Sequence, residues 1–113
     1  MDKTAAIRLL RRNGHKLNEN ITYAARNGGV DIYWANPEID FLSNDWSLIL
    51  DDTHNRTLYL FDIPANSIAP TNLKYRSDKP NLIDLQIEYC DDNFTDTRSN
   101  MRFYPFLYAD EQY

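Results

Sequence analysis

The chain has 113 residues, of which 42% are hydrophobic and 13% aromatic, and its formal net charge is −5 at pH 7. This length and apolar content suffice for one core, so we expect a single α+β domain over residues 1–113 rather than a disordered chain. No apolar run approaches the roughly 18 residues of a membrane-spanning helix, and the basic start is not typical of a secretory signal. The lone Cys90 cannot form an internal disulfide, so we expect a soluble cytoplasmic protein with no membrane partner.

The charges are distributed unevenly along the chain. Residues 1–30 carry six basic and two acidic residues, a net charge of +4, whereas residues 31–113 carry six basic and fifteen acidic residues, a net charge of −9. The acidic body as a whole repels a phosphate backbone and suits a basic groove on another protein. The basic leading segment can still hold nucleic acid locally.

The first predicted element is a helix that begins after Asp2 or Thr4 and ends at Asn13-Gly14. Its apolar stripe includes Ala6, Ile7 and Leu10, which predicts a helix that covers one face of a sheet.

Two β-hairpins are predicted next. The first joins residues 20–25 to residues 30–35 through the turn residues Asn27-Gly28-Gly29, and a short helix follows from Asn36 to about Leu42. The segment containing Trp34 could offer a stacking surface for a base or an anchor for a partner, but aromatic residues on a strand are more often buried, so we favour a place in the core.

The hairpin over residues 45–63 is predicted to be central. Its two apolar runs flank the turn residues 51–56, and pairing of Asp52 with Thr57 makes both faces of the hairpin apolar. One face then holds Trp46, Leu48, Leu50, Tyr59, Phe61 and Ile63, and the other holds Ile49, Leu58 and Leu60. We therefore expect layers of structure on both sides of it.

The second half of the chain predicts a long surface loop over residues 64–81, with one short extended piece near Ile68 or Leu73. Loops of this length in small domains often carry function. A half-buried strand is predicted over residues 82–89 and a last, edge strand over residues 101–108, because Pro105 removes a ladder donor. Residues 109–113 are expected to fray. The predicted fold is α+β, an N-terminal helix on a largely antiparallel sheet of about five or six strands.

Most catalytic motifs are absent. The three glycines form no phosphate-binding loop. Neither His15 nor His54 lies beside a recognisable nucleophile motif, and the acidic neighbours of Cys90 disfavour its thiolate. We expect no enzyme activity of these classes and no cofactor.

Asp45 and Asp62 are one exception. Antiparallel pairing places them on one face as diagonal neighbours, where two carboxylates can hold Mg²⁺. This arrangement resembles the restriction-endonuclease-like PD-(D/E)xK nucleases, in which an Asp starts one strand and a (D/E)-x-K triplet ends the next; the resemblance covers Ala5 to Ala65. Here the triplet reads Asp62-Ile63-Pro64, and without the lysine that positions the attacking water we do not expect efficient cleavage. We favour the interpretation that the two acids merely terminate their strands, and a degenerate nuclease-like domain is the alternative.

The predicted function is therefore binding without catalysis. Acidic residues cluster in two predicted turns and are the candidate contacts to another protein: Asp51, Asp52, Asp91, Asp92 and Asp96. A small acidic protein of this kind, as phages and mobile elements encode, would act as an accessory or inhibitor of a nucleic-acid enzyme by protein–protein contacts.

Two other partners remain open. Nucleic acid would contact the basic leading segment and one nearby aromatic side chain; the candidate residues are Arg8, Arg11, Arg12, Lys16 and Trp34. A second copy of the chain would bind the exposed edge formed by Tyr104, Phe106 and Tyr108 and give a homodimer.

Overall fold

The computed structural model describes residues 1–113, and its centre is the hairpin of strands β3 (Trp46–Asp52) and β4 (Thr57–Ile63). The register pairs Asp52 with Thr57 and Trp46 with Ile63, which confirms the predicted hairpin. Nearly every residue of the two strands is buried, because each face of the pair is covered by other parts of the chain. The alternation of side chains along β3 and β4 thus supplies both cores of the molecule.

Six strands form one sheet in the order β5-β2-β1-β3-β4-β6. The remaining strands are β1 (Asn20–Asn27), β2 (Ile32–Ala35), β5 (Leu85–Glu88) and β6 (Leu107–Gln112). Neighbours pair antiparallel except β1 and β3, which run parallel because the chain crosses back through the 3-10 helix η1 (Ile39–Ser43) between β2 and β3. An α+β fold with a helix on a mostly antiparallel sheet is confirmed.

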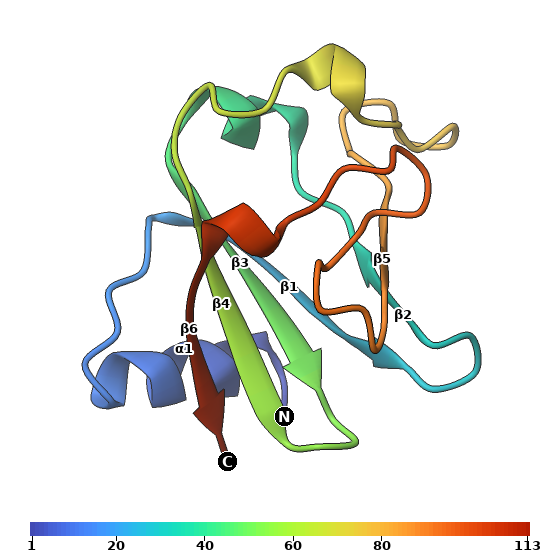
Figure 1. Ribbon diagram of the computed structural model, residues 1–113. Helices are drawn as coiled ribbons and strands as arrows, with labels where there is room; N and C mark the ends of the chain where they lie inside the picture. Colours follow the sequence, from blue (N-terminus) through green and yellow to red (C-terminus); the bar gives the residue numbers. More distant parts are fainter.

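Helix α1 (Lys3–Arg12) lies across one face of the sheet, behind it in Figure 1. The side chain of Asp2 accepts a hydrogen bond of 2.8 Å from the backbone N–H of Ala5, which satisfies one orphan donor of the first turn. The helix ends at Asn13, and Gly14 follows with φ of +86°, the left-handed conformation that favours glycine. The buried cluster beneath the helix consists of Ala6, Leu10, Ile21, Ile49, Leu58 and Leu60.

The opposite face carries the larger core of 16 buried residues, centred on Trp46, Leu48, Phe61 and Ile63. The segment between β5 and β6, orange in Figure 1, passes in front of this face. It contributes Phe94 and Phe103 to the core. A long irregular segment therefore does the covering that a second helix does in many α+β folds.

The last strand differs from its prediction. Pro105 lies not in a strand but in the 3-10 helix η3 (Tyr104–Phe106), where its fixed φ suits the first turn. Strand β6 begins only at Leu107 and runs to Gln112, so the expectation that residues 109–113 fray is wrong. The strand pairs with β4 at the edge of the sheet, although its own residues show no apolar alternation.

One smaller prediction needs correction, and another gains a short helix. The short helix expected from Asn36 is a 3-10 turn that begins at Ile39, because Glu38 is still extended and bridges to Leu82. The loop over residues 64–81 contains the 3-10 helix η2 (Pro70–Asn72) as well as the expected short extended piece, since the backbone is extended at Leu73 and Tyr75 bridges to Ile83. Ile68 and Leu73 on either side of η2 are buried in the larger core, so the loop is anchored to the sheet at two points.

Helix α1 leaves half of its own face of the sheet uncovered. The cluster beneath the helix takes residues from β1, β3 and β4 but none from β2 or β5. Trp34 on β2 points to this uncovered half and is 48% exposed, whereas its neighbour Tyr33 points to the larger core and is 2% exposed. The uncovered half and the turns near Tyr33 are where the molecule has room for a ligand.

Candidate functional sites

The five aspartates predicted to contact a partner do not form one surface. Asp51, Asp52 and Asp96 are buried, and Asp91 and Asp92 lie at the surface. A buried carboxylate costs free energy unless it is hydrogen-bonded, and each of the three is. Three of the five aspartates therefore stabilise the interior of the protein through hydrogen bonds.

Asp51 holds the end of the sheet together. Its two oxygens accept hydrogen bonds of 2.6 Å from the hydroxyl of Tyr113 and 2.5 Å from the hydroxyl of Tyr23. Burial and the bond to this carboxylate raise the pKa of Tyr113 to about 12 and also raise the pKa of Tyr23, because the neutral phenol is the better donor. With both oxygens engaged, Asp51 has no free face for a partner.

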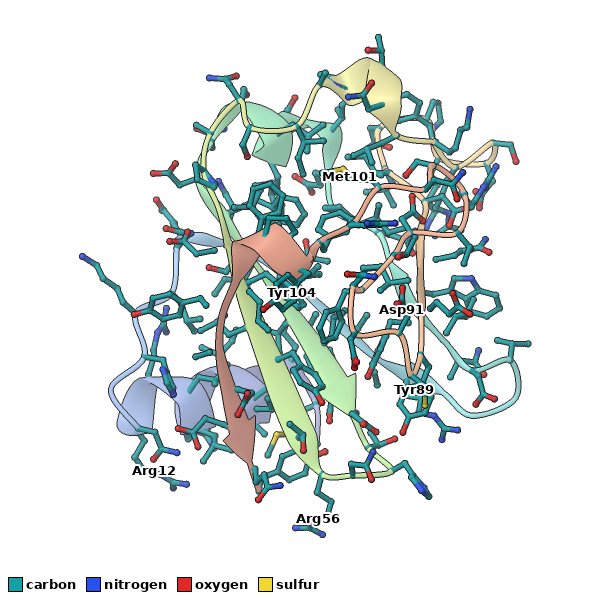
Figure 2. All side chains as sticks on the ribbon, viewed as in Figure 1. Arg12, Arg56, Tyr89, Asp91, Met101 and Tyr104 are labelled. Carbon is teal, nitrogen blue, oxygen red and sulfur yellow. The ribbon has the colours of Figure 1, made fainter.

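Asp52, Asp91 and Asp92 do come together, although two different turns supply them. They line a cavity of about 120 Å³, which we call the acidic aromatic pocket. Its aromatic walls and carboxylates are Tyr33, Tyr59, Tyr89, Phe94, Asp52, Glu88, Asp91 and Asp92. No lysine or arginine is among its ten lining residues. Figure 2 shows Tyr89 and Asp91 next to one another at this side of the molecule.

The chemistry of the acidic aromatic pocket favours a cation. Burial acts to raise the pKa of Asp52, but hydrogen bonds from Asn55 and from the hydroxyl of Tyr89 outweigh it and hold the pKa below 3.8. Hydrogen bonds from Thr95 and Asn93 likewise lower the pKa of Asp91. Asp52 and Asp91 therefore stay ionised, while burial and Asp52 keep the phenol of Tyr89 neutral, with a pKa of about 12.

A cation already occupies one aromatic face at this end of the sheet. The guanidinium carbon of Arg26 lies 4.2 Å from the ring centroid of Tyr89, and its Nη2 is 2.6 Å from Oδ1 of Asp31. This distance is typical of a cation–π contact. Of the other rings of the pocket, Tyr33 lies edge-on to Tyr89 with centroids 5.9 Å apart, and the centroids of Tyr59 and Phe94 are 5.0 Å apart.

A second cavity lies on the uncovered half of the sheet. It has a volume of about 380 Å³, and we call it the Trp34 groove. Its principal walls come from β2, from the loop over residues 75–78, and from β5 with the segment that follows: Trp34, Asn36, Arg76, Asp78, Asp84, Gln86 and Arg98. A third cavity of about 310 Å³, which Lys3 and Glu38 also line, adjoins it and shares Trp34 and Asn36.

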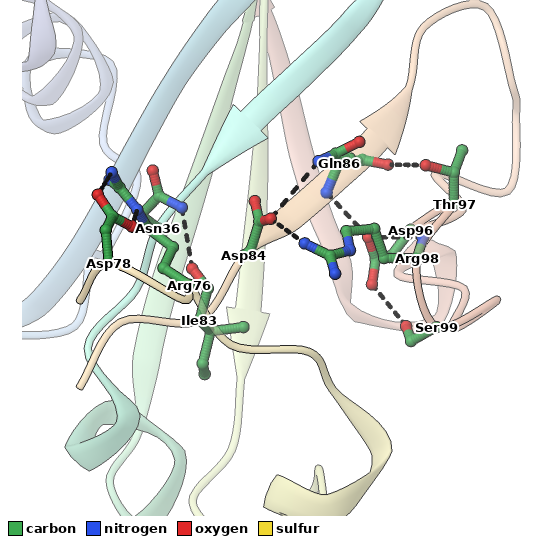
Figure 3. Close-up of polar contacts among 10 residues, drawn as sticks. All are labelled: Asn36, Arg76, Asp78, Ile83, Asp84, Gln86, Asp96, Thr97, Arg98 and Ser99. Atoms are coloured by element: carbon green, nitrogen blue, oxygen red, sulfur yellow. Dashed lines mark hydrogen bonds and ion pairs between the residues drawn. The ribbon is translucent and has the colours of Figure 1, made fainter. Parts of the chain in front are cut away.

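Two ion pairs define the electrostatics of the Trp34 groove (Figure 3). Arg76 binds Asp78 with both a 3.0 Å and a 2.6 Å hydrogen bond, which lower the pKa of Asp78. Arg98 pairs with Asp84, which lies between Arg98 and the side-chain amide of Gln86. The charges along the groove are therefore balanced, in contrast to the acidic aromatic pocket.

Asp96 positions the segment that carries Arg98. Its Oδ1 accepts a bond of 2.8 Å from the backbone N–H of Gln86, and its Oδ2 accepts one of 2.5 Å from the hydroxyl of Ser99. The hydroxyl of Thr97 donates to the carbonyl of Gln86 at 3.0 Å. Figure 3 shows these bonds fastening the segment to β5. Asp96 thus contributes to a site through positioning, not as an exposed partner contact.

The basic residues predicted to bind nucleic acid are all at the surface. Arg8, Arg11, Arg12 and Lys16 are exposed, and none of them forms an ion pair. The structure does not bring them together with Trp34. That side chain shares a cavity with Lys3 at the start of α1, and Arg11 lies about 12 Å farther along the helix axis. In Figure 2, Arg12 lies on the opposite side of the molecule from Tyr89 and Asp91.

Asp45 and Asp62 each have a structural partner. Asp45 accepts a bond of 2.8 Å from the backbone N–H of Ala65 and so caps the turn after β4. Asp62 accepts one of 2.8 Å from the side-chain amide of Asn18. No group of three or more His, Cys, Asp or Glu residues gathers so that it could hold a metal ion.

Sequence reasoning missed most of the Trp34 groove. It considered Trp34 as a stacking surface while favouring its burial, and it identified the long loop that supplies Arg76 and Asp78, but it did not predict that the two lie close together. That proximity depends on β2 pairing with β5, two strands 50 residues apart, with register Trp34 to Gln86. Alternation along residues 82–89 was the available signal, since it places Asp84 and Gln86 on the face opposite the core.

No helix in the structure has both the length and the apolar character that crossing a membrane requires. Comparison of the chain with protein-family models, with curated proteins and with solved structures finds no match.

Proposed function

We propose that this chain is a small acidic binding protein, without catalytic chemistry of its own, that acts on another protein through the acidic aromatic pocket. The observation that carries the proposal is that four carboxylates and four aromatic rings line one cavity with no basic residue among them. Such a site attracts a cation through both charge and the negative faces of the rings. The natural occupant is a lysine or arginine side chain of the partner.

The size of the pocket supports a side chain rather than a free metabolite. Small-molecule sites usually have volumes of about 300–1,000 Å³. The acidic aromatic pocket, at about 120 Å³, accommodates the end of one long side chain. The rest of the partner would then lie against the surrounding surface, where the side chains of Glu88 and Asp92 are exposed.

The partner class that fits this chemistry is a protein with a basic groove, such as an enzyme that acts on nucleic acid. Its lysines and arginines are placed to meet phosphates, and carboxylates at the surface of this chain would compete for them. The proposed role is that of an accessory or inhibitor.

A titration with a lysine-rich peptide tests the pocket. We expect amide resonances of Tyr59, Tyr89 and Asp92 to shift in the NMR spectrum of the labelled protein, and the affinity to fall with salt. The variant Glu88→Gln/Asp92→Asn should weaken binding at least fivefold. The matched variant Glu19→Gln/Asp40→Asn removes the same charge from exposed positions elsewhere and should change it far less. Equal losses in the two variants, or shifts remote from the pocket, would refute the proposal.

Direct nucleic-acid binding is the second candidate, because Arg8, Arg11, Arg12 and Lys16 are exposed and lack acidic partners. A gel shift at about 50 mM salt tests it, since phosphate contacts weaken steeply as salt rises. Arg11→Ala/Arg12→Ala should abolish the shifted band, while Lys74→Ala/Lys79→Ala, in the exposed loop, should retain it. Absence of a band with the unmodified protein would refute this second candidate.

A further inference from the structure

The Trp34 groove lies on the face of the sheet opposite the acidic aromatic pocket, so its ligand is a separate question. The indole of Trp34 is 48% exposed between two cavities of about 380 and 310 Å³, which both include Asn36 in their walls. Both volumes lie within the usual range for small-molecule sites. A large aromatic side chain that a strand holds between two cavities is well suited to stacking against a ligand.

The charges of the groove exclude a strongly charged ligand. The larger cavity is lined by two arginines and two aspartates, and they are paired with each other as Arg76 with Asp78 and Arg98 with Asp84. A phosphate or a carboxylate bound to either guanidinium would lie beside the aspartate already paired with it, and the two negative charges would repel each other. A neutral ligand gains from both partners of each pair, because the carboxylate keeps free lone pairs and the guanidinium keeps free N–H donors.

The polar groups are also held in place before a ligand arrives. The amide of Asn36 donates to the carbonyl of Ile83 at 2.9 Å, which leaves its oxygen free toward the groove. Arg98 is carried by the segment that Asp96 fastens to β5. Preorganised donors and acceptors reduce the ordering cost of binding.

We propose that the Trp34 groove binds a neutral oligosaccharide, with one sugar ring stacked on the indole of Trp34 and its hydroxyls hydrogen-bonded by Asp84, Arg98 and Asn36. A pyranose ring has an apolar C–H face that suits an aromatic plane. Its adjacent hydroxyls each donate and accept, which matches an alternating row of carboxylate, guanidinium and amide. The second cavity beyond Trp34 accommodates a further ring of the chain.

The two tryptophans of the chain make the test direct. Trp46 is fully buried, so quenching by iodide reports on Trp34 alone. The probes are cellohexaose, laminarihexaose, mannohexaose, maltohexaose and chitohexaose, with polygalacturonate, ATP and a single-stranded DNA oligomer as charged competitors. We expect one neutral hexasaccharide to protect Trp34 from iodide and to give a binding isotherm in calorimetry.

Variants then locate the site. Trp34→Ala should weaken calorimetric binding at least tenfold, whereas Tyr104→Ala, at an aromatic position of similar exposure on the other side of the fold, should leave it unchanged. Asp84→Asn should weaken binding while Trp34 remains as the reporter. Binding of only the charged probes, binding that Trp34→Ala does not reduce, or binding to none of the neutral hexasaccharides would each overturn the proposal.

Discussion

The hydroxyl of Tyr113 donates a hydrogen bond of 2.6 Å to Oδ1 of Asp51, a residue 62 positions earlier in the chain. Because the other oxygen of Asp51 accepts from Tyr23 at 2.5 Å, one buried carboxylate connects the end of the chain after β6 to both β3 and β1. The backbone N–H of Tyr113 also donates to the carbonyl of Arg56 at 2.9 Å. These bonds explain why a stretch with little apolar periodicity is an ordered edge strand.

Removing that hydroxyl should destabilise the protein. Tyr113→Phe keeps the ring and leaves Asp51 with one phenol donor, so we expect the free energy of unfolding to fall by about 1.5–3 kcal/mol, the range for a hydrogen bond to a charged group. Urea denaturation followed by circular dichroism measures it. Tyr108→Phe in the same strand, where the side chain is 54% exposed and its hydroxyl makes no hydrogen bond, is the control and should change stability by less than about 0.5 kcal/mol. Equal stabilities of the two variants would contradict this account.

Stability should fall in acid partly through Asp52. Its pKa lies below 3.8 in the folded protein, so its contribution is fully present above the unfolded value and is lost as pH falls through the folded one. We expect the urea midpoint to drop between about pH 5 and pH 2. Asp52→Asn, and Asn55→Ala, which removes the side-chain hydrogen bond from Asn55 to Asp52, should each flatten that drop. Parallel curves for both variants and the unmodified protein would show that this carboxylate is not involved.

Alkali should destabilise the fold through its tyrosines. Tyr23, Tyr33, Tyr59, Tyr89 and Tyr113 all have a pKa above the ordinary 10.0, and that of Tyr89 and Tyr113 is about 12. The stability from a raised pKa is present below the unfolded value and is lost as pH rises toward the folded one, here from about 10 to 12. Absorbance at about 295 nm should therefore show phenol ionisation at higher pH in the native protein than in urea. Coincident curves would contradict the raised values.

The central hairpin was predictable because its sequence allows only one arrangement. Pairing Asp52 with Thr57 puts Trp46 and Phe61 on one face and Ile49 and Leu60 on the other. A slip of one residue in the register would move these side chains to the wrong layer. Helix α1 was also predictable, because its N-cap Asp2 and the Asn13-Gly14 pair that ends it are local sequence signals.

The candidate sites were harder to predict because they depend on long-range contacts. Charged residues in turns are usually exposed. Asp51 is instead fully buried, because tyrosines from distant parts of the chain reach it, and no local pattern encodes that. The final strand was misplaced for the same reason, since hydrogen bonding to β4 rather than apolar alternation defines residues 107–112.

Substitution by glycine should have opposite effects on stability at two positions in the turn after β5. Cys90 has φ of +64° and an exposed side chain, and Phe94 has φ of +50° but packs between Tyr59 and Phe61. A left-handed non-glycine residue costs roughly 1–2 kcal/mol, and glycine's extra chain entropy offsets part of the relief. In urea denaturation under reducing conditions, Cys90→Gly should therefore raise the free energy of unfolding by up to about 1 kcal/mol, while Cys90→Ala should not. Phe94→Gly should lower it by about 3 kcal/mol, because the lost packing exceeds the relief; stabilisation there, or none at Cys90, would contradict the backbone argument.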